Sequence, residues 1–273
     1  DYHFSQFFAS PITYNPANSG AFNADFRAVA NYRSQYGSLG QPYTTFSVAA
    51  DAPIKLTNEA YDRNFLGLGL AVVSDNAGTA DFNSLHIAGS AAYALDLGGT
   101  ANAPHFISLG LQVAFLQRSL DFDKATWESQ WTGTSFNPGI PSNESYTGKM
   151  VETNIDLGAG ISWYNTLSEN TRLLAGASVL HANAPKVEML GAEDALLRKF
   201  TGHLSLAVNM PDQDVTYYPN LMVMFQGPNR IIDVGAEVEF SLWDRTQFTD
   251  FRNNFSTNIG AYYRYRDAIY FIG

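Results

Sequence analysis

The most regular feature of the chain is a strict alternation of apolar residues with small or polar ones. From Leu66 to Val72 every second residue is Leu or Val, and the residues between them are Gly or Ala. Successive side chains of a strand point to opposite faces, so a period of two over this length predicts a β-strand. The same pattern recurs in four further segments: 106–116, 154–164, 203–210 and 232–240.

The two faces of these five segments differ sharply in chemistry. All 23 positions on the first face are apolar, whereas 12 of the 19 on the second are Gly, Ala or Ser and 4 are acidic. A soluble β-sandwich would carry larger polar and β-branched residues on its second face, since glycine weakens a strand. An apolar face toward lipid and a small, polar face toward a lumen are typical of outer-membrane barrels. We therefore predict an all-β fold, a transmembrane antiparallel β-barrel that is closed so that no strand edge lies unpaired in hydrocarbon.

Weaker alternation extends this prediction to about twelve strands. Aromatic residues near strand ends suggest interfacial girdles, although ordinary aromatic strand propensity explains any single one. The expected strands are 25–36, 44–54, 65–74, 85–96, 105–118, 151–164, 171–181, 200–210, 215–226, 230–241, 256–266 and 268–273.

Residues 1–24 do not alternate. Pro11 and Pro16 disfavour a strand there, and several aromatic residues disfavour disorder. We expect this N-terminal segment to pack on the barrel wall or in its lumen, and residues 25–273 to form the barrel as a single domain.

The connections between the strands alternate between the two sides of the predicted barrel. With the N-terminus in the periplasm, the long connection 119–150 falls on the outer side, as is usual for extracellular loops. Residues 190–199 are predicted to form a short helix in another outer loop, and 242–255 is a long periplasmic connection. Exposed aromatic residues are typical interface anchors. The candidate partner-binding residues are Trp127 and Trp131 in the outer loop, with Trp243, Phe248 and Phe251 in the periplasmic connection. For the outer pair, packing within the loop or at the membrane interface is an equal alternative.

Composition narrows the function further. Lys and Arg total 16 against 26 Asp and Glu, a net charge of −10, which argues against nucleic acid and against docking on an anionic membrane surface. We expect the charges on the second face to form a structural network in the lumen, with a charged permeation path as the alternative. The candidate network is Arg27, Arg33, Asp233, Glu237, Glu239, Arg264 and Arg266.

No motif points to catalysis or to a cofactor. The chain has no cysteine, and its five histidines are scattered without the short spacing of zinc ligands. Paired glycines such as Gly67 and Gly69 lie within strands, so they are not a phosphate-binding loop. We expect neither enzyme activity nor a metal or cofactor site.

Four blocks of residues stand out beside the alternation. The blocks are His3-Phe4-Ser5-Gln6-Phe7 with Pro11, Asn15-Pro16-Ala17 and Gly20; Asn31-Tyr32-Arg33-Ser34-Gln35 with Pro42, Thr45, Ser47 and Asp51; Gln226-Gly227-Pro228; and Gly260-Ala261-Tyr262-Tyr263-Arg264 with Asp267-Ala268. Together they resemble the PorP/SprF membrane proteins of the type IX secretion system of Bacteroidetes. Tyr36 stands where members of that family often carry Trp, and the chain ends at Gly273, where they typically continue for about two strands, which gives 14 in the complete protein.

The resemblance implies an outer-membrane accessory of type IX secretion, with its signal peptide removed. Such a protein would bind and anchor, or help to export, a large cell-surface protein such as an adhesin through its C-terminal domain, a role linked to gliding motility. It implies three kinds of partner: the secreted protein, periplasmic secretion components and outer-membrane lipid. The alternative from the residues is a plugged 14-stranded barrel that transports hydrophobic small molecules, with residues 1–24 as its hatch. A soluble sugar-binding β-domain fits the apolar face poorly.

Overall fold

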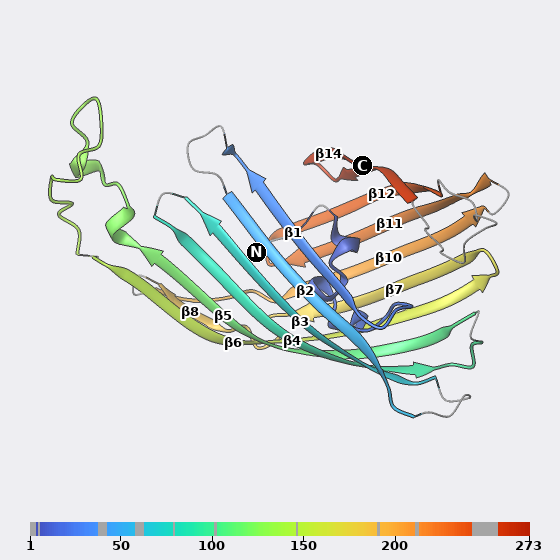
Figure 1. Ribbon diagram of the computed structural model, residues 1–273. Coiled ribbons are helices and arrows are strands. Elements are labelled where there is room, and N and C mark those ends of the chain that lie inside the picture. The colour runs from blue at the N-terminus through green and yellow to red at the C-terminus, as the bar shows by residue number, and fades with distance from the viewer. Residues whose placement is uncertain are drawn as a thin grey trace, which may run out of the picture.

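Twelve strands form one antiparallel sheet in the computed structural model (Figure 1). The structure describes residues 4, 6–37, 43–57, 63–78, 80–100, 103–145, 147–189, 192–210, 213–241 and 256–273. The strands of the sheet, in spatial order, are β1 (Arg27–Gln35), β2 (Tyr43–Lys55), β3 (Phe65–Ala77), β4 (Phe82–Asp96), β5 (His105–Asp121), β6 (Lys149–Ser168), β7 (Thr171–Leu180), β10 (Lys199–Met210), β11 (Val215–Gln226), β12 (Asn229–Ser241), β13 (Ser256–Arg264) and β14 (Ala268–Ile272).

The sheet is a continuous up-and-down meander. Each strand pairs with the strand before it in the sheet order, and the prediction of twelve strands is confirmed, with ends that differ by a few residues. Several predicted strands are longer than expected; β6, for example, runs for 20 residues. The connections therefore alternate between the two ends of the sheet.

One local prediction is wrong. The segment 190–199 was expected to be helical, but Ala192–Ala195 is a strand, β9, that pairs with β8 (Lys186–Met189) as a separate hairpin. An isolated helix of this length is marginal in water, whereas a hairpin satisfies the backbone groups of both strands at once.

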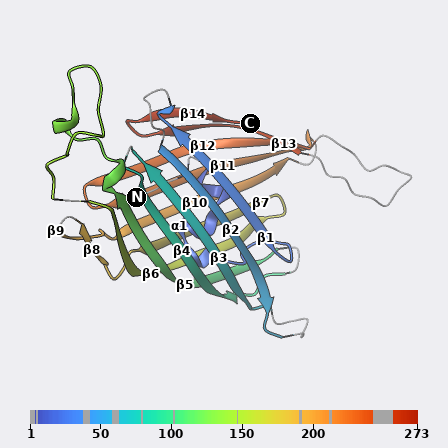
Figure 2. The same ribbon diagram turned by 60° about the vertical axis from the view of Figure 1, so that its left-hand side comes forward.

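The two faces of the sheet have the chemistry that the alternation predicts. Leu70 and Leu111 on the outward face are 67% and 68% exposed, while Ala71 and Gln112, their neighbours in the chain, are buried. Figures 1 and 2 show a strongly curved sheet whose concave face carries the N-terminal segment. The small residues of the alternating pattern therefore lie inside the curve and the large apolar ones outside.

The strands at the two ends of the sheet have one partner each among the described residues. β1 pairs with β2 and β14 pairs with β13, and no pairing joins β1 to β14 in this part of the chain. The all-β antiparallel sheet is thus established, and its closure into a barrel stays a prediction. Among the described helices, none is long and apolar enough to cross a bilayer.

The described part of the N-terminal segment contains three single-turn helices. They are η1 (Phe7–Ala9), α1 (Pro11–Tyr14) and η2 (Pro16–Asn18). Pro11 and Pro16 each occupy a first helical position, where the missing amide proton costs nothing. The same two prolines that disfavour a strand thus begin two of the helices.

Candidate functional site

The N-terminal segment lies within the curve of the sheet and contacts strands from both of its halves. Ile12 packs against Ala71, Ala88 and Ala114 on the concave face of β3, β4 and β5. Phe7, at the other end of the segment, lies in a cluster with Met222 of β11 and Tyr262 of β13. The segment therefore bridges strands that are far apart in the sheet order, as Figure 2 shows.

Asn15 is a fully buried polar anchor of the segment. Its side-chain Nδ2 donates to the carbonyl oxygen of Ile161 and to Oγ of Ser162, each at 3.1 Å. Its Oδ1 accepts from the amide of Ala17 at 3.0 Å, and His203 Nε2 lies 3.0 Å from Nδ2. A fully buried amide must find partners for its donors and acceptor, and Asn15 finds them on β6, on β10 and within its own turn.

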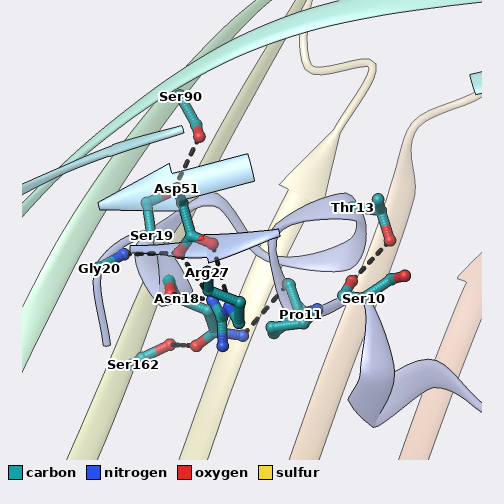
Figure 3. A network of polar contacts seen from close by, with 10 residues as sticks. All are labelled: Ser10, Pro11, Thr13, Asn18, Ser19, Gly20, Arg27, Asp51, Ser90 and Ser162. Carbon is teal, nitrogen blue, oxygen red and sulfur yellow. Dashed lines mark hydrogen bonds and ion pairs between the residues drawn. The ribbon is translucent and has the colours of Figure 1, made fainter. Parts of the chain in front are cut away.

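Two further side chains fasten the end of η2 to the sheet (Figure 3). Ser162 donates to Asn18 Oδ1 at 2.6 Å, so this serine of β6 links two asparagines of the segment. The hydroxyls of Ser19 and Ser90 are 2.7 Å apart. These contacts replace the water that the polar groups would otherwise bind, so the segment can lie dry against the sheet.

An ion pair holds the C-terminal end of the segment in place, where the chain enters β1. Asp51 of β2 accepts from Arg27 Nη2 at 2.7 Å and from Arg27 Nε at 3.0 Å. The same carboxylate accepts from the backbone amide of Gly20 at 2.8 Å, and Arg27 Nη2 also donates to the carbonyl oxygen of Asn18 at 3.3 Å. Figure 3 shows these groups converging from the segment, β1 and β2.

Glycines of the concave face form the surface on which the segment rests. A Cβ added to Gly67 would overlap the carbonyl group of Ser19, and one added to Gly110 would overlap the backbone of Ala17. A Cβ on Gly160 would overlap the amide of Asn15. These strand glycines, which weaken the strands themselves, are required because the segment approaches them closely, with its backbone at Gly67 and Gly110 and with the Asn15 side chain at Gly160.

Two buried carboxylates lie near the other edge of the sheet. Asp233 accepts from Arg264 at 2.9 Å, between residues that are paired in register on β12 and β13. Glu237 accepts from the Tyr262 hydroxyl at 2.7 Å, and Asn220 in turn donates to that hydroxyl at 2.8 Å. Each carboxylate is thus paired with a group on an adjacent strand and not with one across the concave face.

The remaining predicted network residues lie apart from these pairs. Glu239 accepts from the Tyr218 hydroxyl at 2.6 Å, and Arg33 donates to Gln35 on its own strand at 2.5 Å. Arg266 does not share a strand face with Arg264, because β13 ends at Arg264. Arg266 lies in the following turn with φ of 62° and stacks its guanidinium 5.2 Å from the Tyr265 ring.

Sequence reasoning missed a histidine–aspartate cluster on the concave face. Asp156 Oδ2 lies 2.8 Å from His181 Nδ1 and 3.2 Å from His86 Nε2, and all three side chains are buried. Burial lowers the pKa of His181, although the Asp156 carboxylate opposes that shift. The three residues come from widely separated places, so no spacing in the sequence reveals them. Among the described residues no group of His, Asp or Glu has a geometry that could hold a metal ion.

The candidate partner-binding residues divide into two sets. Trp131 is 48% exposed in the connection between β5 and β6, with its ring 4.9 Å from that of Phe136, and Trp127 is half-buried nearby. The second set lies outside the described residues: Trp243, Phe248 and Phe251, in the connection 242–255.

Comparison with known proteins identifies the family. No curated protein matches the chain. The family model described as "Type IX secretion system membrane protein PorP/SprF" matches residues 1–273, the whole of the sequence. The chain therefore belongs to the PorP/SprF family of type IX secretion system membrane proteins.

Proposed function

We propose that this protein is an outer-membrane β-barrel accessory of type IX secretion that binds a large cell-surface protein, such as an adhesin, through the C-terminal domain of that protein, and anchors it or helps to export it. PorP/SprF proteins are membrane components of the secretion system, which implies contact with other secretion components, and they are not a known enzyme family. The proposal adds the barrel, the outer membrane and the cargo.

The exposed apolar face supports the barrel. Side chains such as Leu109, Ile155 and Phe271 are 61%, 56% and 81% exposed, and in water such a surface would be strongly unfavourable. Toward lipid it is favourable, and the outer edges of β1 and β14 must then be paired so that no backbone group lies unsatisfied in hydrocarbon. We propose that residues 25–273 form this wall as one domain, within a barrel of 14 strands in the complete protein.

The observation that best supports a protein-binding role is that the N-terminal segment fills the concave face. Residues of the N-terminal segment pack against strands on both halves of the sheet, and Asn15, Ala17 and Ser19 have no exposed surface. A wide conducting pore would need an inner face that is open to water. An interior occupied by its own chain leaves the connections at the two ends of the sheet as the surfaces for a protein partner.

The connection between β5 and β6 is the proposed cargo contact. It carries η4 (Phe122–Lys124) and η5 (Glu128–Gln130), and it projects from one end of the sheet in Figure 1. Trp131 is its large exposed aromatic side chain, and aromatic anchors dominate many protein interfaces. We place periplasmic secretion components at the opposite end, where the connection 242–255 supplies Trp243, Phe248 and Phe251.

The decisive experiment is purification of the chain from native outer membranes in detergent, with mass spectrometry of the proteins that co-elute. A large surface protein in near-equal amount, with its C-terminal domain protected from protease, would support the proposal. Recovery of the chain alone from intact outer membranes would argue against cargo binding, and recovery from the soluble fraction would argue against the barrel.

The N-terminal segment also favours a second candidate, a plugged barrel that transports hydrophobic small molecules with this segment as its hatch. That function needs a continuous apolar path through the interior. The polar anchors Asn15, Asn18 and Asp51 lie across the interior instead, so we rank this candidate second. Lipid or fatty acid extracted in stoichiometric amount from the purified chain would reverse the ranking.

A further inference from the structure

A polar cavity of about 280 Å³ lies at the end of the sheet from which the β5–β6 connection projects. Its walls come from the ends of β3, β4, β5 and β6 and from η4. The lining residues are Asn76, Asp81, Asn83, Gln117, Ser119, Asp121, Lys124 and Lys149.

The cavity opens on the outward face and not on the concave one. Asn83 has the same orientation as Ile87 further along β4, and Gln117 has the same orientation as Phe115 on β5, because side chains of a strand alternate. Ile87 and Phe115 are paired in register, and both are exposed apolar residues. The outward face thus changes from apolar to polar within a few residues, and the cavity lies at that boundary.

The donors and acceptors of the cavity match a phosphorylated sugar. Asn83 Nδ2 donates to Asn76 Oδ1 and to Ser74 Oγ, which leaves Asn83 Oδ1 as an acceptor and Asn76 Nδ2 as a donor for a sugar hydroxyl. The Gln117 amide offers both a donor and an acceptor. Lys149 is exposed and makes no ion pair among the described residues, so its ammonium group is available to a phosphate. Lys124 is paired with Asp81, and the two together add a second charged donor and a carboxylate acceptor.

The size of the cavity sets the size of the group that it can accept. A water molecule occupies about 30 Å³ in the liquid, so the cavity has the volume of roughly nine waters. This volume suits one sugar ring with part of a phosphate, and it is too small for a folded protein element.

We propose that this cavity binds the phosphorylated sugar head group of a membrane glycolipid, whose acyl chains lie along the apolar face beside Ile87 and Phe115. The proposal rests on the proposed function, since it requires the sheet to be embedded in a membrane with this end at the outer surface. A glycolipid fits the cavity better than a simple phospholipid does. Amides and carboxylates, which bind sugar hydroxyl groups, outnumber the lysines, which bind phosphate.

The test is a binding titration with the full chain, purified in detergent and stripped of lipid. The probe is monophosphoryl lipid A, a phosphorylated glucosamine disaccharide lipid, and the readout is the fraction of lipid-bound protein by native mass spectrometry. We expect saturable binding, weakened about tenfold by Lys149→Ala and more by Lys149→Ala with Asn83→Leu. Lys55→Ala is the matched control. It removes a lysine at the end of β2 that lies at the other end of the sheet from the cavity, and we expect unchanged binding.

Three comparisons decide the outcome. Glucosamine 1-phosphate without acyl chains should bind far more weakly; equal affinity would assign the cavity to a free sugar phosphate and overturn the lipid. Phosphatidylglycerol that binds as tightly as lipid A, or variants that bind like the wild type, would also overturn the proposal.

Insertion of the chain into liposomes, measured by flotation, reports on the barrel separately. A chain that floats with liposomes yet fails to bind lipid A contradicts this inference alone, whereas a chain that does not float contradicts the proposed function itself.

Discussion

Arg27 and Asp51 face each other in register on β1 and β2 and form an ion pair of 2.7 Å. The carboxylate also accepts from the amide of Gly20, so one residue of the sheet fixes both the exit of the N-terminal segment and the start of the first strand. The Asp51 side chain is 3% exposed and that of Arg27 is 24% exposed, so water screens the pair only in part.

Replacement of Asp51 by Asn should loosen the N-terminal segment. The change removes the charge that Arg27 and the Gly20 amide share, and we expect a loss of about 1–3 kcal/mol in the free energy of unfolding. Hydrogen exchange of the amides of residues 15–22 should rise. Asp81→Asn, which removes an exposed ion pair with Lys124, is the control and should change stability little. Equal exchange in the two variants would contradict the anchoring role.

A side chain at Gly110 should displace the segment. Gly→Ala within a strand is normally neutral or stabilising, so a loss of stability isolates the overlap with Ala17. We expect Gly110→Ala to cost about 1–3 kcal/mol and to expose residues 11–18 to protease. The control is Gly202→Ala on β10, where an added Cβ meets nothing within 4 Å. The idea fails if both glycines tolerate alanine equally well.

Removal of the Asn15 side-chain amide should lower the free energy of unfolding, although no large apolar side chain is lost. Asn15→Ala removes the hydrogen bond that Ser162 Oγ accepts and leaves His203 Nε2 without its buried partner, and we expect a loss of about 1–3 kcal/mol in the free energy of unfolding in detergent. Asn23→Ala, at an exposed position, should have no measurable effect. An unfolding midpoint of Asn15→Ala that matches that of Asn23→Ala would show that the segment is held by other contacts.

Low pH should weaken the cluster at the end of β7. Burial lowers the pKa of His181 in the folded protein, so below the usual histidine value of about 6.5 the unfolded chain binds more protons than the folded one. Stability should therefore fall as the pH decreases from 7.5 to 5. Asp156, His86 and Lys199 face the same ring. The His181→Asn variant should show a shallower pH dependence of its unfolding midpoint; an unchanged slope would assign the effect to other groups.

Loss of the two tryptophans in the β5–β6 connection should weaken cargo binding without changing the fold. With Trp127→Ala and Trp131→Ala together, we expect at least a tenfold lower yield of co-purified surface protein. Trp163→Ala, which removes an outward-facing tryptophan from β6, is the matched control. If the control lowers the yield as much as the loop variant does, the contact lies elsewhere.

Local pattern was sufficient for the strands. The alternation from Leu66 to Val72 predicts both the existence of β3 and which of its faces is apolar, because the period of a strand is a property of the backbone alone. The helix expected within 190–199 was wrong because short segments have weak intrinsic preferences and take the structure that pairs their backbone, here the β8–β9 hairpin.

The candidate site was only partly predictable. Asp233 and Arg264 were both expected on the second face, yet their pairing depends on the register of β12 and β13. Asn15 and Ser162 are 147 residues apart in the chain, and no spacing rule connects them. The glycines of β3, β5 and β6 are a signal in the sequence: strand glycines on one face indicate that another part of the molecule approaches closely, but they do not say which part.

The sequence by itself thus determined the strands, their order as a meander and the chemistry of each face, since these follow from periodicity and side-chain type within a few residues. Only the tertiary structure decided that the N-terminal segment lies on the glycines of the concave face, that Asp51 joins Gly20 to Arg27, and that His86, Asp156 and His181 meet. Such contacts depend on the curvature and register of the whole sheet, which bring distant residues together, and no local pattern encodes that geometry.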